Sequence, residues 1–208
     1  MKYEKEFESY FSKENIFTLG DARRFLSKLG ASEAYAKLFI HNQVKRQRIF
    51  ALGNGYYTFS NNEAVVGFRF APFYYGLEYA LTIRRLWTQM ANPVVITASK
   101  AKPGVKEIMG HRVIVRRIAK RMMFGFEYVK YSGLFVPVSD IEKTIIDFTY
   151  YRIGLGSEDM RTLLGSADKR KLMAYALKSG ARVRRSVEAL VKWQMAMPKH
   201  NSNFRMTF

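Results

Sequence analysis

The sequence contains no cysteine, so it can form neither a disulfide framework nor a thiolate zinc site. Only His41, His111 and His200 remain as imidazole ligands for a metal. Nowhere do roughly 18 uncharged apolar residues run together, as a membrane-spanning helix requires. The N-terminal stretch MKYEKEFESYF also lacks the apolar core of a signal peptide. These absences argue against redox, zinc and membrane roles, and we expect a cytoplasmic protein without a cofactor.

Acidic residues are also scarce. The 208-residue chain has 17 Asp and Glu against 35 Lys and Arg, which gives a net charge of +18. The excess positive charge is spread along the chain, and it indicates a polyanionic partner. A chain of this length with 48% hydrophobic residues can bury a sizeable core in one large domain or two small ones. We expect two domains, residues 1–62 and 63–208.

Residues 1–62 show the pattern of three helices followed by a β-hairpin. Residues 2–12 place aromatic side chains at helical spacing, and a second apolar stripe from Ala22 to Leu29 ends at Gly30, a natural helix terminator. Ser32 can cap a third helix, in which Ala36, Ile40 and Val44 recur four apart on one face.

Beyond this helix, segments 48–51 and 56–59 are rich in strand-forming residues, and Gly53-Asn54-Gly55 supplies the positive φ angles of a tight reversal. The order is that of a winged helix-turn-helix, in which the last helix enters the major groove and the wing lies along the DNA backbone. A short run of basic residues usually only faces solvent. In a winged helix-turn-helix, however, basic residues at the end of the last helix would lie against DNA phosphates. The predicted DNA-binding residues are Ser32, Tyr35, Lys37, His41, Asn42, Lys45, Arg46, Arg48 and Asn54, with Tyr35 equally compatible with the core.

Residues 63–208 combine strands and helices, so the predicted fold class is α+β. We expect a helix from Gly76 to Met90, a sheet with strands at 94–97, 112–117, 124–128 and 134–138, and a helical bundle after about residue 152. The tail from Pro198 shows no pattern. The basic faces predicted to meet a partner or flanking DNA carry Arg112, Arg116, Arg117, Arg182, Arg184 and Arg185.

Asp140, Glu142 and Asp147 are the strongest catalytic candidates. Ser139 to Glu142 reads as a helix capping box, and Asp140, Lys143 and Asp147 as a charge ladder along the helix. The alternative is a metal-dependent nucleic-acid-processing enzyme that uses the three carboxylates. We favour the structural interpretation and predict neither a catalytic site nor a metal site. A non-catalytic protein-interaction adaptor is a further alternative.

The middle of the chain resembles a known family. In order, it carries YYGLEYALTIRRLWTQMANPVVIT, VIVRRI, FGFEYVKY and VPVSDIEKTIIDFTYYR, between Tyr74 and Arg152. These segments are similar to the AbiEi antitoxins of type IV toxin–antitoxin systems, which also have a winged helix before the block and a helical region after it.

The resemblance implies a DNA-binding antitoxin without a catalytic centre. Such a protein represses its own operon by binding inverted repeats cooperatively through the winged helix, with self-association on DNA. Its C-terminal domain antagonises a nucleotidyltransferase-like toxin. The family pattern transfers functional roles only to the winged-helix positions from Ser32 through Arg48 and to Gly53-Asn54-Gly55. The expected partners are therefore operator DNA and the cognate toxin.

Overall fold

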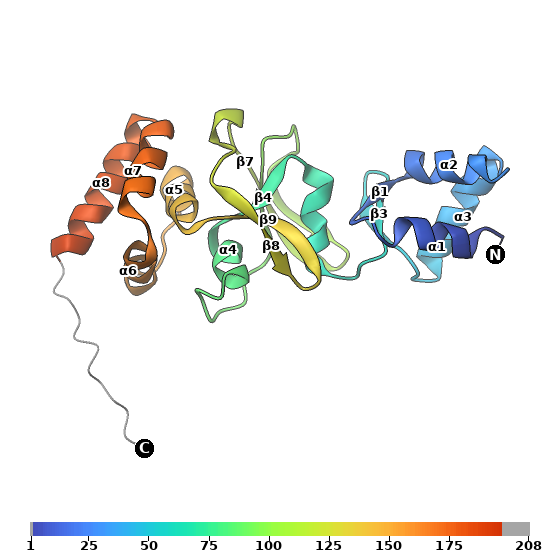
Figure 1. Ribbon diagram of the computed structural model, residues 1–208, viewed down its shortest axis with the longest axis horizontal. Helices are drawn as coiled ribbons and strands as arrows, with labels where there is room; N and C mark the ends of the chain where they lie inside the picture. The colour runs from blue at the N-terminus through green and yellow to red at the C-terminus, as the bar shows by residue number, and fades with distance from the viewer. Residues whose placement is uncertain (1, 197–208) are drawn as a thin grey trace, which may run out of the picture. The chain divides into compact units, whose positions relative to one another are not determined.

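A computed structural model describes residues 2–196, and it shows an α+β protein (Figure 1). The chain divides into two compact units, with the division after Ser139. None of the helices in this described part is long and apolar enough to cross a membrane. The tail from Pro198, together with His200, lies outside the described residues.

The start of the first unit follows the predicted order of helices and strands, with one short strand added. Its elements are α1 (Glu4–Phe11), β1 (Phe17–Thr18), α2 (Leu19–Lys28), α3 (Glu33–Lys45), β2 (Phe50–Gly53) and β3 (Tyr56–Thr58). Strand β3 pairs antiparallel with both β1 and β2, so the three strands form a small sheet in the order β1-β3-β2. The hairpin predicted around Asn54 is therefore extended by a strand that precedes α2.

Aromatic packing holds α1, α2 and α3 together. Phe7 lies at the centre, 1% exposed, with ring centroids 4.7 Å from Phe11 and 5.0 Å from Phe39. Thr18 and Asp21 form a capping box at the start of α2, in which the Thr18 side chain accepts from the Asp21 N–H and Asp21 accepts from the Thr18 N–H. Helices α1 and α2 thus form the base on which α3 packs.

The rest of the first unit is built on a six-stranded sheet. Its elements are η1 (Glu63–Phe70), β4 (Phe73–Tyr75), α4 (Leu77–Ile83), β5 (Val94–Thr97), β6 (Gly104–Ile108), β7 (His111–Arg117), η2 (Lys120–Met122), β8 (Phe126–Tyr131) and β9 (Leu134–Ser139). The strand order is β6-β7-β5-β4-β9-β8, with β5–β7 and β4–β9 parallel and the other pairs antiparallel. The buried residues Tyr74, Tyr75 and Tyr79 lie in its core.

The predicted helix from Gly76 to Met90 is too long. Helix α4 ends at Ile83, because the backbone turns into the left-handed region at Arg85 (φ 56°) and the Leu86 N–H bonds back to the Leu81 carbonyl at 2.9 Å. Met90, the last residue of the predicted helix, is 90% exposed. The apolar spacing beyond Ile83 therefore does not mark a helix.

Side-chain hydrogen bonds connect the first 62 residues to the rest of the first unit. Asn62 Nδ2 donates to the Ser132 carbonyl at 2.8 Å, and the Arg69 guanidinium in η1 donates to the Leu52 carbonyl in β2. The predicted domain boundary after residue 62 lies within the first unit, where these contacts cross it.

Gly67 allows a close approach between η1 and β4, which gives a test of this packing. Its N–H donates to Tyr75 Oη at 2.9 Å, and an added Cβ would overlap the Phe73 ring and lie 2.7 Å from that same oxygen. Gly67→Ala is expected to destabilise the first unit by about 1–3 kcal/mol through overpacking. Thermal unfolding followed by Trp87 fluorescence in a Trp193→Phe background measures this. Gly20→Ala in α2, where the new Cβ makes only ordinary contacts, is the matched control and should be neutral or stabilising.

The second unit is a bundle of four helices: α5 (Ile141–Tyr151), α6 (Ser157–Ser166), α7 (Lys169–Lys178) and α8 (Ala181–Ala196). Buried Leu163, Leu172 and Val187 contribute to its core. Figure 1 shows α7 and α8 lying side by side.

The capping box predicted at Ser139 is wrong by one residue. Ser139 ends β9, and Asp140 caps α5 by accepting from the Lys143 N–H at 2.7 Å. Glu142 does not reach back to the cap, since its carboxylate accepts from the Asp168 N–H at 2.7 Å. Lys143 and Asp147 form an ion pair, but both side chains are 0% exposed. The predicted charge ladder is therefore a buried pair and not a solvated face.

Candidate nucleic-acid interface

Helix α3 has one buried face and one exposed face. Its buried residues are Ala36, Phe39, Ile40 and Gln43. The exposed face is formed by Ala34, Lys37, Leu38, His41 and Lys45. These five residues follow helical spacing, so they form one continuous strip along the helix.

Neighbouring elements fix α3 at both of its ends. At the start, Ser32 Oγ accepts from the Tyr35 N–H at 3.2 Å, and Glu33 pairs with Arg23 of α2 at 3.0 Å. Near the end, Gln43 Nε2 donates to Glu4 Oε1 of α1 at 3.1 Å. The helix that presents the exposed strip is therefore connected to α2 near its start and to α1 near its end.

The basic turn after α3 leads directly into the hairpin. Lys45, Arg46 and Arg48 are exposed, and the Arg48 guanidinium pairs with Glu4 at 2.8 Å. Asn54 lies exposed at the tip with φ 54°, between two glycines that also have positive φ. The tip has the tight left-handed geometry that its sequence predicted.

A shallow hollow separates α3 from the hairpin. Its volume is about 220 Å³, and it is lined by Leu19, Lys37, Ile40, His41, Val44, Ala51 and Tyr57. Lys37 and His41 therefore belong both to the exposed strip and to this hollow.

The predicted DNA-binding residues fall into two groups in the structure. The first group is exposed and consists of Lys37, His41, Lys45, Arg46 and Asn54. The other predicted residues are half-buried or make contacts within the domain. Ser32 caps α3, Asn42 is half-buried, Arg48 binds Glu4, and the Tyr35 hydroxyl donates to the Lys2 carbonyl at 3.1 Å.

Leu38 is the position that the sequence prediction missed. It is 56% exposed on the same strip as Lys37 and His41. The signal was present in the sequence, because Leu38 lies out of phase with the buried stripe of Ala36 and Ile40.

Charge is distributed unevenly around this part of the unit. Between Ala34 and Asn62 the sequence has no Asp or Glu, whereas α1 carries Glu4, Glu6 and Glu8. The face formed by α3 and the hairpin is therefore electropositive, and the α1 side is not.

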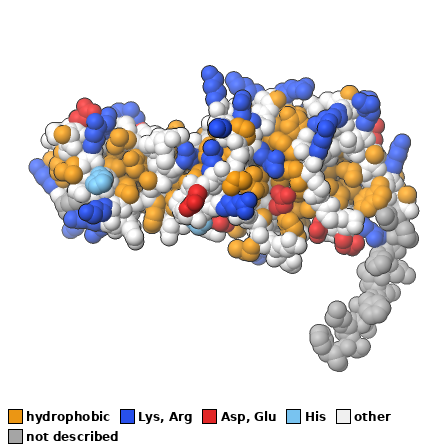
Figure 2. All heavy atoms as spheres, turned by 180° about the vertical axis from the view of Figure 1, so that it is seen from behind, with side chains coloured by type: hydrophobic (Ala, Val, Ile, Leu, Met, Phe, Trp, Pro, Cys, Tyr) orange, Lys and Arg blue, Asp and Glu red, His pale blue; other side chains and the backbone are white. Residues whose placement is uncertain are grey.

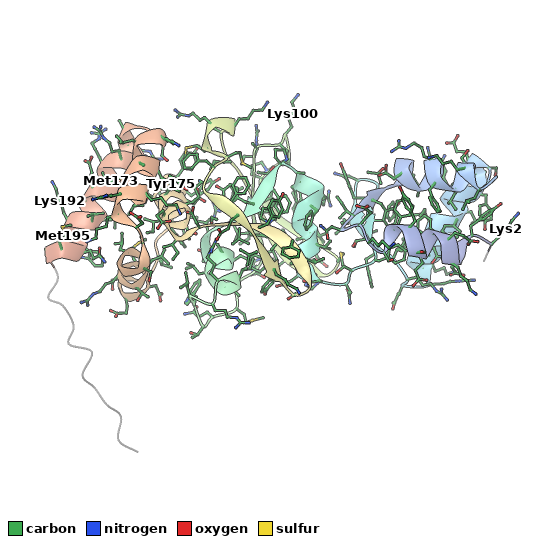
Figure 3. All side chains as sticks on the ribbon, in the orientation of Figure 1. Lys2, Lys100, Met173, Tyr175, Lys192 and Met195 are labelled. Atoms are coloured by element: carbon green, nitrogen blue, oxygen red, sulfur yellow. The ribbon has the colours of Figure 1, made fainter. Side chains whose placement is uncertain are left out.

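A second group of basic residues gathers at one edge of the six-stranded sheet. Strands β5 and β7 are parallel neighbours, with Thr97 opposite Arg117, so the loops after them lie at the same edge. These loops carry the exposed residues Lys100, Lys102, Lys120 and Arg121. Figure 2 shows Lys and Arg side chains along one edge of this part, and Lys100 points outward in Figure 3. Of the predicted basic face, Arg112 and Arg117 are exposed and Arg116 is half-buried.

The predicted arginines of α8 have mainly local partners. Arg182 donates to the Tyr150 carbonyl at 2.9 Å and to the Thr149 carbonyl at 3.4 Å, where α5 ends. Arg184 pairs with Glu188 at 3.6 Å, and Arg185 donates to the Ala181 carbonyl at 3.5 Å. Arg182 thus fastens α8 to α5.

The three candidate catalytic carboxylates are already engaged. Lys171 Nζ lies 3.0 Å from Asp140 and 2.9 Å from Glu142, so an ammonium occupies the place between them. Burial opposes the charge of Glu142, but hydrogen bonds from Lys171 and the Asp168 N–H outweigh it and hold its pKa below the usual value. Asp147 pairs with Lys143. Among residues 2–196, no group of three or more His, Asp or Glu side chains is arranged to hold a metal ion.

Comparison with known proteins gives a likeness of fold. The crystal structure of the RV2827C protein from Mycobacterium tuberculosis matches with a TM-score of 0.63 over 93% of this chain and 78% of that chain. The two sequences are 9% identical, so the likeness carries no argument about individual residues. No protein-family model and no curated protein matches the chain.

Proposed function

We propose that the protein is a cytoplasmic DNA-binding antitoxin that represses its own operon and acts by binding, without catalysis. The observation that carries the DNA-binding part is the exposed strip of α3 beside the hairpin. It combines Lys37, His41 and Lys45 with an acid-free stretch that continues to Asn62.

The order of elements supports the same proposal. Helices α2 and α3 are joined by a short turn, and α3 is followed by the β2–β3 hairpin, as in a winged helix-turn-helix. In such modules the helix reads base edges in the major groove while the wing contacts phosphates. Lys37, Leu38 and His41 would then face the groove, and Lys45, Arg46 and Asn54 the backbone.

The antitoxin part of the proposal rests on the resemblance of the segments between Tyr74 and Arg152 to AbiEi antitoxins. On this basis the protein binds an inverted-repeat operator and antagonises a nucleotidyltransferase-like toxin. A toxin gene next to this one and loss of toxicity on co-expression would support that assignment. Toxicity that is undiminished by co-expression would contradict it.

Removing one phosphate contact gives a direct test of the DNA-binding surface. Lys45→Ala is expected to weaken binding to all DNA sequences and to lower the slope of log affinity against log salt by about 0.9. Titration of labelled upstream DNA at several salt concentrations measures both quantities.

Lys5→Ala is the matched control, because it removes the same charge from the exposed side of α1. It should leave the salt slope unchanged. Equal slopes for both variants and the parent protein would show that Lys45 contacts no phosphate.

A further inference from the structure

The second unit contains an apolar groove formed by α5, α6, α8 and the loop that follows α5. Its volume is about 800 Å³. The walls are mainly aliphatic and aromatic, and include Phe148, Ile153, Leu155, Met160, Leu190 and Trp193. We refer to it as the α8 groove. Lys192 and Met195, which Figure 3 labels on the outer side of α8, are not among its lining residues.

Most polar side chains that line the α8 groove form hydrogen bonds within the protein. The Thr149 hydroxyl donates to the Ile145 carbonyl at 2.9 Å, and the Ser186 hydroxyl donates to the Arg182 carbonyl at 3.2 Å. Arg182 itself is bound to the end of α5. No acidic residue lines the groove.

Among the lining residues, Arg152 carries a positive charge that is exposed and not held by a hydrogen bond or an ion pair of the described chain. It is exposed, and it makes no ion pair with any residue of the described chain. Its backbone is fixed as the C-cap of α5, with φ 55° and its N–H bonded to the Phe148 and Thr149 carbonyls. Arg152 therefore places a guanidinium without an ion pair at a groove whose walls are mainly apolar, next to Arg182, whose guanidinium is held by backbone carbonyls. This arrangement complements a ligand with an apolar body and one anionic group.

We propose that the α8 groove binds a single-chain amphiphile with one carboxylate, with its alkyl chain against the apolar walls and its head group on Arg152. The volume falls within the usual range for small-molecule sites, about 300–1,000 Å³. An extended peptide suits the groove less well, because its backbone amides would be buried against walls that offer them few partners. This site is separate from the proposed DNA-binding surface, and its test does not depend on that function.

Trp193 provides a reporter inside the groove. The sequence has two tryptophans, so Trp87→Phe leaves the signal of Trp193 alone. The probe is laurate below its micelle concentration, titrated into the full chain. A saturable change in Trp193 emission is expected. Decanoate, which is two methylenes shorter, should bind about 15-fold more weakly, since each buried methylene contributes about fourfold.

Two substitutions distinguish the contribution of the charged head group to binding from that of the apolar walls. Arg152→Gln should weaken laurate binding about tenfold and leave dodecanol binding unchanged, because only the carboxylate uses the charge. Ala189→Phe fills the groove from an exposed position of α8 and should abolish binding of both. Ala181→Phe, an exposed position of the same helix outside the lining, is the matched control and should bind normally. Calorimetry gives the affinities, and thermal unfolding checks that each variant is folded.

Several results would overturn the proposal. Laurate affinity that is unchanged in Arg152→Gln, or in Ala189→Phe, would place the ligand elsewhere. Equal affinities for laurate and decanoate would exclude burial of the chain. Laurate binding that appears only after residues 197–208 are deleted would make that segment the occupant of the groove. Binding that appears only on dilution would make a second copy of the chain the occupant. If laurate does not bind and an acidic helical peptide changes Trp193 emission, a partner protein is the occupant.

Discussion

Asp147→Ala is expected to destabilise the second unit by about 3–5 kcal/mol, because it removes the carboxylate that pairs with the buried Lys143 ammonium. Both side chains are 0% exposed, and they pair one helical turn apart on α5. Helix α5 contacts α6, α7 and α8, so the loss affects the whole bundle. Denaturant unfolding followed by Trp193 fluorescence in the Trp87→Phe background measures the effect on this unit.

Replacing both partners distinguishes two causes of the destabilisation: a buried lysine that has lost its carboxylate, and the loss of the stabilisation that the ion pair itself provides. Lys143→Met combined with Asp147→Leu removes both charges and keeps similar volumes, and we expect it to recover most of the lost stability. If the double variant is as unstable as Asp147→Ala, the polar pair itself stabilises the bundle and the lysine that has lost its carboxylate is not the cause.

Reversing the charge of Lys37 and Lys45 together is expected to weaken DNA binding by on the order of 100-fold at physiological salt, because two phosphate contacts become repulsions. Both residues are exposed on the strip of α3 that we propose enters the groove. Fluorescence anisotropy with upstream DNA measures the loss of affinity.

Lys5→Glu combined with Lys13→Glu changes the net charge of the protein by the same amount on and just after α1. This control should retain binding to within a few-fold. Equal losses in the two double variants would mean that the overall charge, and not the face of α3, attracts DNA.

The sequence predicted the first 60 residues well because their signals are local. The Ser32 cap, the buried stripe of α3 and the positive-φ turn at Asn54 each depend on residues within a few positions of one another. The Thr18–Asp21 capping box was missed although its signal is equally local. These elements also position the candidate DNA-binding surface, so most of its exposed residues were predicted.

Features that depend on distant segments were not predictable in the same way. Lys143 and Asp147 have the spacing of a solvated ion pair, and only the packing of α5 against the other helices buries them. The basic edge that joins Lys100 and Lys120 exists because β5 and β7 are parallel neighbours, which neither loop encodes alone. The contacts of Tyr35 and Arg48 depend on Lys2 and Glu4, which lie more than 30 residues earlier in the chain.

The most direct test of the account is a footprint of the full-length protein on the DNA immediately upstream of its gene. We expect protection of an inverted repeat, with affinity that falls steeply as salt increases. Protection should be lost in the Lys37→Glu, Lys45→Glu variant and kept in the Lys5→Glu, Lys13→Glu control. Absence of any protection by the parent protein at low salt, or protection that survives reversal of the α3 charges, would contradict the proposed function.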